Sequence, residues 1–368
     1  MRRVRVLVVD DSALVRKTVS ELVTCEEIEV VGVAVNGEEA LQRAQVLDPD
    51  VVSLDISMPV MDGMTCLRHL IELRRQPVVI LSTLALESSF TTFKALAVGA
   101  VDFVTKPGSG QYLPGLAELG VELRRKIITA SRVPREKIGR RSAGSASSPS
   151  VREPPRVASP RVVPFDLGVR AVIGIGGSTG GAQGLERVLR DLPAGLPVAL
   201  VAVQHLPAGF SRPFARYLDS FSAFDVKEAE DGDVLRRQTA YIAPGGAHVR
   251  LRRTRAGLVL RTDDSGAPRC GYRPSIDIFF YSLAAAERRR AAAVLLSGMG
   301  EDGVKGLAAV HEFGGGTLVQ DRDSSVVYDM AERAVRRGCV DRELPLERLG
   351  EALAERVDPL RRRQRDRA

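Results

Sequence analysis

The C-terminal half of the chain is organised around a glycine-rich segment, Val172-Ile173-Gly174-Ile175-Gly176-Gly177-Ser178-Thr179-Gly180-Gly181. Its apolar beginning predicts a buried strand, and Leu185, Val188 and Leu189 follow at the spacing of a helix. Ser178 is therefore expected on a sharp strand-to-helix turn, where the glycines around it let a substrate carbonyl approach. The pattern Gly-x-Ser-x-Gly is typical of the nucleophile elbow of serine hydrolases.

Two other interpretations of this glycine-rich turn stay open on the stretch alone. A phosphate-binding Walker loop requires a lysine after its last glycine, where this chain has Ala182. A dinucleotide-binding fingerprint requires a third glycine where this chain has Thr179. Both of these motifs are forms of a phosphate-binding loop, and the second alternative to a nucleophile is a tight turn without chemistry. The rest of the chain has to decide between them.

Length and composition indicate a globular protein with two domains. A chain of 368 residues can bury two cores, and its hydrophobic content of 44% is ordinary. No apolar run reaches about 18 residues, so we expect no membrane insertion. The acids Asp10 and Asp11 close the first apolar run, which argues against a signal peptide. Four cysteines stand far apart without metal-ligand spacing, as is typical of reduced thiols in a cytoplasmic protein: Cys25, Cys66, Cys270 and Cys339.

The formal net charge of +7 is unevenly distributed along the chain. Residues 129–168 are rich in Ser, Pro and Arg, a composition that cannot offset chain entropy by burial and that predicts a flexible basic linker. The tail at 359–368 is rich in arginine, and the rest of the chain is mildly acidic. We therefore expect domains at 1–128 and 169–358. No segment has the clustered base-reading residues of a recognition helix, so no nucleic-acid partner is expected.

The N-terminal domain is predicted to be a five-stranded parallel sheet with helices on both faces. Helix-like segments separate five short apolar runs, at residues 4–9, 30–35, 51–54, 78–81 and 101–104. Polar side chains follow several of these runs, and the carboxyl ends of parallel strands meet at one edge of a sheet. Carboxylates brought together there suit Mg²⁺, and a lysine and a hydroxyl can contact a phosphoryl group. The residues concerned are Asp10, Asp11, Asp55, Ser82 and Lys106.

This segment resembles the receiver domain of two-component response regulators. The motifs that carry the resemblance are Asp10-Asp11-Ser12, Leu54-Asp55-Ile56-Ser57-Met58-Pro59, Met61-Asp62-Gly63 and Lys106-Pro107. The resemblance implies that Asp55 accepts a phosphoryl group from a histidine kinase. It also implies that Asp10, Asp11 and Asp55 hold Mg²⁺, that Ser82 and Lys106 sense the phosphate, and that Phe103 occupies the aromatic switch position.

The C-terminal domain is predicted to be a doubly wound, mainly parallel α/β domain. Three reactive residue types follow three of its predicted strands: Ser178 after 172–175, His205 after 198–203 and Asp302 after 293–296. A histidine can take the proton of a serine hydroxyl, and a buried carboxylate fixes the tautomer of that histidine. The order Ser–His–Asp along the chain differs from that of α/β-hydrolases and from both serine-protease orders, but order is not part of the mechanism.

Other residues could fill these roles on sequence alone. His248 follows Gly245-Gly246-Ala247 and is an alternative base, whereas His69 and His311 lie in helix-like segments. Glu301 and Asp321 compete with Asp302 for the acid. Asp302 also precedes Gly303 at a predicted helix start, where its alternative role is to cap that helix.

The second half resembles the catalytic domain of the CheB family of chemotaxis protein-glutamate methylesterases. The motifs concerned are residues 176–181, Gln204-His205, Tyr241-Ile242-Ala243-Pro244-Gly245, Arg273-Pro274-Ser275-Ile276-Asp277, residues 298–303 and Gln320-Asp321. The resemblance implies hydrolysis of glutamate methyl esters on methyl-accepting chemoreceptors, and often deamidation of receptor glutamines, by the triad Ser178, His205 and Asp302. Gly177, Ser297 and residues 330–333 depart from the commonest family pattern, which bears on substrate preference.

The predicted reaction needs no metal at the ester. His205 takes the proton of Ser178, and backbone N–H groups at the elbow, such as that of Thr179, and that of Met299 stabilise the oxyanion. The resemblance further implies a histidine kinase of the CheA type as phosphodonor, activation by phosphorylation of Asp55, and a monomer recruited to receptor arrays at the inner face of the membrane. Two alternatives remain: a non-enzymatic binding module under receiver control, and an enzyme that is mainly a deamidase.

Overall fold

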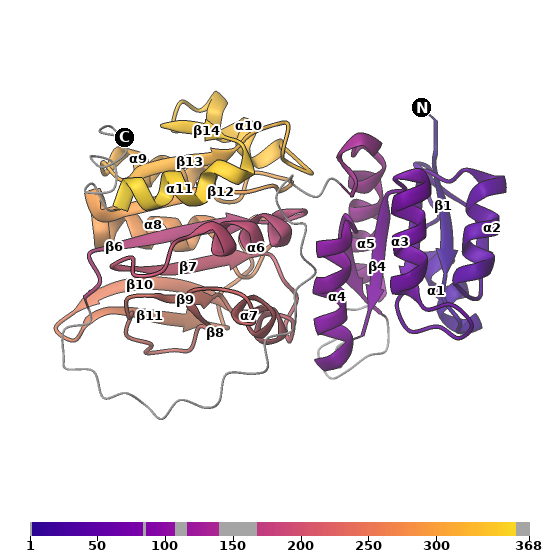
Figure 1. Cartoon of the computed structure of the whole chain (residues 1–368), viewed down its shortest axis with the longest axis horizontal. Helices are drawn as coiled ribbons and strands as arrows, with labels where there is room; N and C mark the ends of the chain where they lie inside the picture. Colours follow the sequence, from indigo (N-terminus) through magenta and orange to yellow (C-terminus); the bar gives the residue numbers. More distant parts are fainter. Residues whose placement is uncertain (1, 84–85, 107–115, 140–167, 358–368) are drawn as a thin grey trace. The chain divides into compact units, whose positions relative to one another are not determined.

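The computed structural model describes residues 2–83, 86–106, 116–139 and 168–357 (Figure 1). The chain divides into two compact units, residues 1–141 and residues 142–368. The described part of the first unit continues to residue 139, past the predicted boundary at 128, because the last helix ends at Ser131 and a short 3₁₀ turn follows at Arg135–Lys137. Residues 140–167 of the predicted linker and the whole predicted tail lie outside the described residues.

The first unit contains the predicted five-stranded parallel sheet. Its strands have the order β2-β1-β3-β4-β5, and every neighbouring pair is parallel. The strands are β1 (Val4–Val9), β2 (Ile28–Ala34), β3 (Val51–Asp55), β4 (Val78–Ser82) and β5 (Asp102–Thr105). The central strands are buried along their length, which explains their continuous apolar runs.

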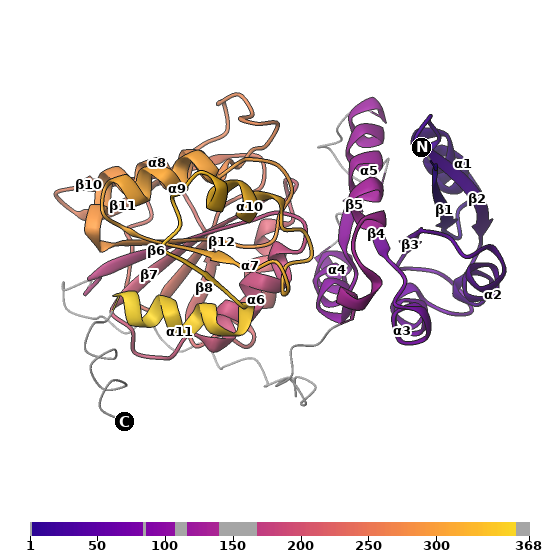
Figure 2. The same ribbon diagram turned by 90° about the horizontal axis from the view of Figure 1, so that it is seen from above.

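Helices cover both faces of this sheet, as Figure 2 shows. On one face lie α1 (Ala13–Val23) and α5 (Leu116–Ser131), and on the other lie α2 (Gly37–Leu47), α3 (Gly63–Arg74) and α4 (Leu86–Val98). The first three helices begin where a side chain caps them: Ser12, Asn36 and Asp62 each accept a hydrogen bond from a backbone N–H of the first turn.

The second unit is built on a seven-stranded parallel sheet. Its strands have the order β14-β13-β12-β6-β7-β9-β8. They are β6 (Ala171–Gly177), β7 (Val198–Gln204), β8 (Asp225–Glu228), β9 (Thr239–Ile242), β12 (Ala291–Leu295), β13 (Gly316–Gln320) and β14 (Arg342–Leu344). The chain leaves β6 towards β7 and returns on its other side as β12, so β6 marks the point where the winding direction changes. Ligands of doubly wound sheets bind at the carboxyl ends of the strands at such a point.

Helices again cover both faces of the sheet. On one face α8 (Ile276–Glu287), α9 (Val304–Glu312) and α10 (Asp329–Arg336) pack in sequence, and the antiparallel hairpin of β10 (His248–Thr254) and β11 (Gly257–Asp263) lies against α8. On the other face α6 (Gly181–Asp191) packs against α11 (Leu346–Val357). The helix α7 (Ser211–Asp219) contacts β8, and a short 3₁₀ turn at Arg288–Arg290 follows α8.

The glycines of β6 allow α8 to approach the sheet closely. A Cβ atom added at Gly176 would lie 2.4 Å from Cγ2 of Ile276, the first residue of α8. A Cβ atom added at Gly174 would lie 2.6 Å from Cδ2 of Leu283, two turns further along. The glycine-rich segment therefore brings the N-terminus of α8 against the end of β6, which is where Ser178 lies.

Apolar runs at residues 239–243 and 317–319 predict β9 and β13, but two other strands of this sheet were not predicted from the sequence. They are β8 and β14, which form its two edges. Their sequences, Asp-Val-Lys-Glu and Arg-Glu-Leu, are short and polar because an edge strand is exposed on one side. Neither segment contains an apolar run, so the sequence pattern does not predict a strand there.

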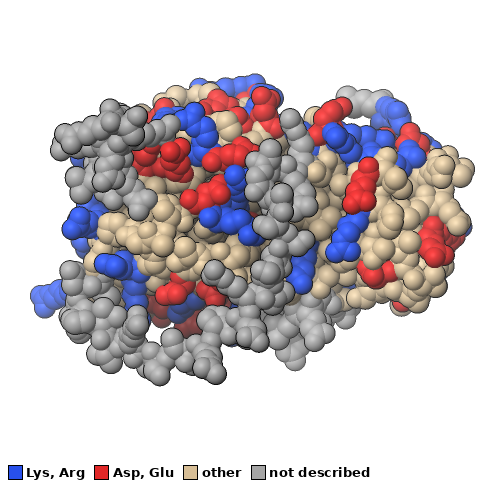
Figure 3. Space-filling model, viewed as in Figure 1, with Lys and Arg blue, Asp and Glu red and all other residues tan. Residues whose placement is uncertain are grey.

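Charged side chains of both signs are interspersed over the described surface on the face shown in Figure 3. Exposed helix faces also have pairs one turn apart, such as Lys17 with Glu21 at 3.9 Å. Exposed pairs of this kind contribute about 0–1 kcal/mol each, so the folded state depends mainly on the apolar interior. Among the described helices, none combines the length and the apolar character needed to cross a membrane.

Candidate active site

Ser178 lies on the predicted turn between β6 and α6. Its backbone N–H donates to the carbonyl oxygen of Ser297 at 3.0 Å, which fixes the turn to the end of β12. Gly180, the N-cap of α6, has φ of +78°, a left-handed conformation that favours glycine. Backbone contacts thus hold the Ser178 hydroxyl at the carboxyl end of the sheet before any substrate binds.

His205 follows β7 and lies beside Ser178. Its Nδ1 is 3.1 Å from Oγ of Ser178, and its Nε2 is 2.9 Å from Oδ2 of Asp302. An ionised carboxylate can only accept, so Nε2 carries the proton and Nδ1 is left to accept the hydrogen bond that the serine hydroxyl donates. The three predicted residues therefore form one hydrogen-bonded chain in which the histidine is oriented to act as a base.

The carboxylate of Asp302 is fully buried and accepts four hydrogen bonds. Besides the bond from His205, it accepts from the N–H groups of Ile276 at 2.7 Å and Asp277 at 3.1 Å and from the hydroxyl of Ser275 at 2.7 Å. Burial by itself would raise the pKa of this carboxyl, but the hydrogen bonds from its neighbours and the adjacent imidazole outweigh burial, so its pKa is lowered. Asp302 is therefore held as the anion that His205 needs.

Asp302 does not have the capping role that the sequence offered as its alternative. The N-cap residue of α9 is Gly303, which has no side chain with which to cap the helix. Asp302 instead accepts hydrogen bonds from the first residues of α8. In return, Oδ1 of Asp277 in α8 accepts from the N–H groups of Gly303 at 3.0 Å and Gly306 at 2.6 Å, at the start of α9. Asp302 thus caps the first turn of α8, and Asp277, a residue of α8, caps the first turn of α9.

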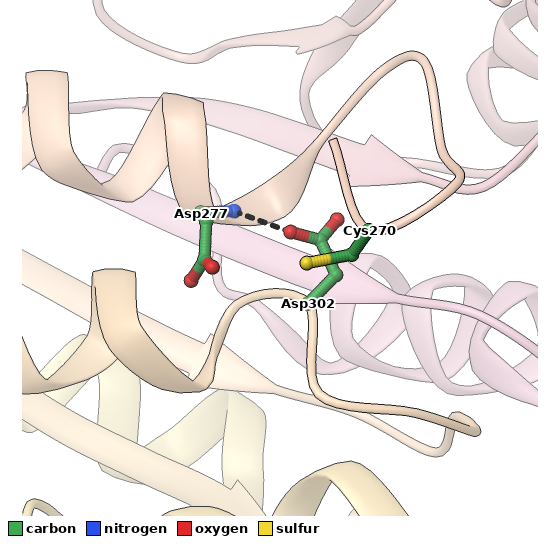
Figure 4. Close-up of side chains that lie close together, drawn as sticks. All are labelled: Cys270, Asp277 and Asp302. Carbon is green, nitrogen blue, oxygen red and sulfur yellow. Dashed lines mark hydrogen bonds between the residues drawn. The ribbon is translucent and has the colours of Figure 1, made fainter. Parts of the chain in front are cut away.

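Cys270 lies beside these two aspartates, as Figure 4 shows. The Cys270 sulfur and one carboxylate oxygen from each of Asp277 and Asp302 are all within 4.8 Å of one another. Both oxygens of Asp302 already accept two hydrogen bonds each, and the N-termini of α8 and α9, which carry partial positive charge, face the pair. We therefore assign the two carboxylates to helix capping and to orientation of His205, and not to a metal.

The competing histidine has its own partners. His248 is buried, its Nδ1 accepts from the N–H of Ser275 at 3.2 Å, and its Nε2 lies 3.0 Å from the carbonyl oxygen of Ala267. Both ring nitrogens are engaged by backbone groups, so this histidine anchors the chain before α8. Of the competing acids, Glu301 is exposed, and Oδ1 of Asp321 accepts from Ser324.

Sequence reasoning missed several residues that support the triad. The side-chain amide of Gln204 donates to the carbonyl oxygen of Ser178 at 2.8 Å, and Oδ2 of Asp329 accepts from the N–H of Gly300 at 2.7 Å. The hydroxyl of Ser297 donates to the carbonyl oxygen of Thr179 at 2.7 Å. Gln204 directly precedes His205 in one of the family motifs, and this position beside His205 was the feature of the sequence that could have indicated its role.

The oxyanion donors remain a prediction. Gly298 packs against Ser178, since a Cβ atom added at Gly298 would lie 2.9 Å from that of Ser178. The N–H of Gly298 donates to the carbonyl oxygen of Val327, and that of Gly300 to Asp329, so these two groups are engaged. The loop that contains Met299 is nevertheless adjacent to the serine, as the predicted role of its N–H requires.

The first unit brings its predicted residues together at the carboxyl edge of its sheet. Asp10 and Asp55 are buried, Asp11 is exposed, and one carboxylate oxygen from each lies within 4.8 Å of the others. The ammonium of Lys106 bridges Asp10 at 2.8 Å and Asp55 at 2.7 Å. Asp11, Asp55, Ser82 and Lys106 line a cavity of about 80 Å³. A site of three carboxylates and one lysine fits a hard divalent cation and a phosphoryl group.

The titration of this site follows from its burial. Burial raises the pKa of Asp55 despite the hydrogen bond and charge of Lys106, and the neighbouring Asp10 raises it further. Burial opposes the charge on Lys106, but its hydrogen bonds to Asp10 and Asp55 and their charges outweigh burial and raise its pKa. The hydroxyl of Ser82 lies 2.5 Å from that of Thr92 in α4. The ammonium of Lys106 thus offsets the repulsion between the carboxylates of Asp10 and Asp55.

Fold and site together define a serine hydrolase built on a parallel α/β sheet and preceded by a receiver-type unit. Residues 173–353 match the family model described as CheB methylesterase, and residues 6–116 match the response regulator receiver domain. The protein-glutamate methylesterase/protein-glutamine glutaminase of Geobacillus kaustophilus is 40% identical to this chain over 360 residues, 97% of this chain and 99% of that protein. The protein of the same name from Pyrococcus abyssi is 37% identical over 361 residues, 98% of this chain and 95% of that protein.

Among solved structures, the CheB methylesterase catalytic domain of Thermotoga maritima is 35% identical, with a TM-score of 0.49, and the match covers 50% of this chain and 97% of that one. The family matches and the near full-length relatives show that the chain belongs to the CheB methylesterase family, with a response regulator receiver domain ahead of the catalytic domain.

Proposed function

We propose that the chain hydrolyses the methyl esters of glutamate side chains on methyl-accepting chemoreceptors, releasing methanol, and deamidates receptor glutamines by the same acyl chemistry. The observation that carries the proposal is the hydrogen-bonded chain from Ser178 through His205 to Asp302. The relatives' names, which pair methylesterase with glutaminase, support the choice of substrate.

The reaction proceeds through an acyl-enzyme. Nδ1 of His205 takes the proton of Ser178 as its Oγ attacks the ester carbonyl, and the buried anion of Asp302 stabilises the imidazolium that forms. The N–H groups of Thr179 and Met299 stabilise the oxyanion, and loss of one such donor costs about 3–4 kcal/mol. Collapse of the intermediate breaks the bond to methanol, which leaves with the proton from His205. Water, deprotonated by the same base, then releases the glutamate.

The first unit controls this activity. Asp55 accepts the phosphoryl group, supplied by a histidine kinase of the CheA type. Asp10, Asp11 and Asp55 would hold Mg²⁺, which would supply positive charge to the transferring group. Lys106 and Ser82 bind the phosphoryl oxygens, so phosphorylation breaks the contacts that Lys106 makes with Asp10 and Asp55. We propose a cytoplasmic monomer that is recruited to receptor arrays, with the part of the predicted linker after the first unit joining the two units.

The test is methanol release from methylated receptor membranes, with and without a small-molecule phosphodonor and Mg²⁺. We expect release that rises on phosphorylation and that is lost in Ser178→Ala, which keeps its fold because the hydroxyl is replaced by a smaller group. Appreciable release by Ser178→Ala would overturn the assigned nucleophile. Release that ignores the phosphodonor would keep the esterase and remove the proposed control.

A further inference from the structure

The imidazole of His205 is covered on one face by the phenol ring of Tyr272. The two ring centroids are 3.7 Å apart and the planes differ by 10°. The edges of the imidazole point to Ser178 and Asp302, so the hydrogen bonds fix its two nitrogens while the stacking contact fixes the plane that contains them. None of the motifs analysed above assigns a function to Tyr272.

The chain around Tyr272 forms a tight turn. The N–H and carbonyl of Arg269 exchange hydrogen bonds with those of Tyr272 at 3.0 and 2.9 Å. The two residues between them have positive φ angles, +52° at Cys270 and +81° at Gly271, as a type I′ turn requires. Tyr272 follows this turn directly, so the turn determines where its ring lies.

Buried and charged contacts tie this turn to the rest of the unit. The guanidinium of Arg273 donates to the carbonyl oxygens of Asp264 and Gly266, and the carbonyl oxygen of Arg273 accepts from the N–H of Gly246 at 3.0 Å. Three residues after Tyr272, the N–H of Ser275 donates to His248 and its hydroxyl donates to Asp302. One continuous segment therefore holds both the acid that binds His205 and the ring that covers it.

We propose that Tyr272 is a positioning residue for the proposed esterase, which holds the plane of the His205 ring and stabilises its protonated form. The face of an aromatic ring carries negative electrostatic potential and attracts a cation placed over it. His205 becomes cationic only while the acyl-enzyme forms and breaks, so this attraction is strongest in the transition state. Because Tyr272 is only half-buried, the ring can be changed without opening the core.

The test compares Tyr272→Phe, which keeps the aromatic face, with Tyr272→Leu, which keeps apolar cover and removes that face. Both are made in the full chain, phosphorylated, and assayed over a range of pH with receptor methyl esters and with an activated ester. We expect the Phe variant to match the parent. We expect the Leu variant to lose about tenfold in kcat with little change in KM, and the acidic limb of its pH–rate profile to move to lower pH, because the protonated imidazole is less stabilised.

A series of fluorinated variants at position 272 controls for a folding defect. Phenylalanine with one to four ring fluorines at position 272 keeps the shape of the ring and progressively weakens its negative face, so kcat should fall stepwise along the series. The inference is overturned if the Leu variant keeps the parent kcat, if its pH profile does not move, if the Phe variant is as impaired as the Leu variant, or if fluorination has no effect. A parent protein that releases no methanol while cleaving the activated ester would count against the proposed substrate and leave this test intact.

Discussion

Replacing Asp302 by Asn tests the two functions that the structure gives this residue. The amide oxygen of Asn can keep the bonds from Ser275 and Asp277, but its NH₂ group then faces the N–H of Ile276 and Nε2 of His205. His205 can bond to that NH₂ group only as the other tautomer, with its proton on Nδ1. In that form Nδ1 donates to Ser178 and cannot accept its proton.

The expected loss of activity is large. A triad histidine held in the wrong tautomer loses about 10⁴-fold in kcat, so we expect Asp302→Asn to fall by about 10³–10⁴-fold in methanol release. The matched control is Glu301→Gln, which removes the same charge from the exposed neighbouring residue and should leave the rate unchanged.

The same substitution should destabilise the second unit. It leaves the N–H of Ile276 buried without an acceptor, at about 1–3 kcal/mol, and removes the negative charge from the remaining bonds, so we expect about 2–4 kcal/mol in total. This corresponds to a fall in Tm of roughly 5–15 °C for a unit of this size. Calorimetry of the full chain measures it, with the transition of the first unit as an internal reference.

The pH dependence has a definite sign. Because the pKa of Asp302 lies below its usual value of 3.8, the stability contributed by its ionised form is present above that value and is lost as the pH falls through the folded pKa. The Asn variant should lack this acid-side loss. An Asp302→Asn protein that keeps its fold and releases methanol within tenfold of the parent rate, or a Glu301→Gln protein that is equally impaired, would refute the assignment.

Two further changes probe the remaining assignments. Asp55→Asn removes the phosphoryl acceptor, so the rate of methanol release should no longer rise with phosphodonor and Mg²⁺; a variant that still responds would place the acceptor elsewhere. His248→Ala leaves the N–H of Ser275 and the carbonyl of Ala267 without their partner, so it should lower the free energy of unfolding by about 1–3 kcal/mol. Its kcat should stay within about tenfold of the parent, whereas a fall to the level of Ser178→Ala would make His248 the base.

The shared location of the three residues was predictable because each follows an apolar strand, Ser178 and His205 directly and Asp302 on the loop after β12. Parallel strands end at one edge of a sheet, so Ser178, His205 and Asp302 had to share that edge once β6, β7 and β12 were recognised. The same argument placed Asp10, Asp55 and Lys106 in the first unit. In both units the prediction depended on continuous apolar runs, which are typical of strands buried on both faces.

The contacts that run across the chain were not predictable from it. Tyr272 reaches His205 through a turn whose geometry depends on positive φ angles at Cys270 and Gly271, and local sequence gives no measure of where such a turn points. Asp277 caps a helix that begins 27 residues later, while Asp302 caps one that begins 26 residues earlier. Such pairings depend on how α8 and α9 pack. The glycines of β6 allow α8 to approach the sheet, but they do not predict which residues of α8 and α9 then meet.

The mutual capping of α8 and α9 has a consequence for judging relatives of this protein. Asp302 serves the fold as well as the proposed reaction, because the first turn of α8 depends on its carboxylate. A related protein that has lost the esterase activity would still be under selection to keep this aspartate. Ser178 has no comparable structural duty in its side chain, whose described bond is to His205. The serine, and not the aspartate, is therefore the residue whose loss would mark an inactive descendant.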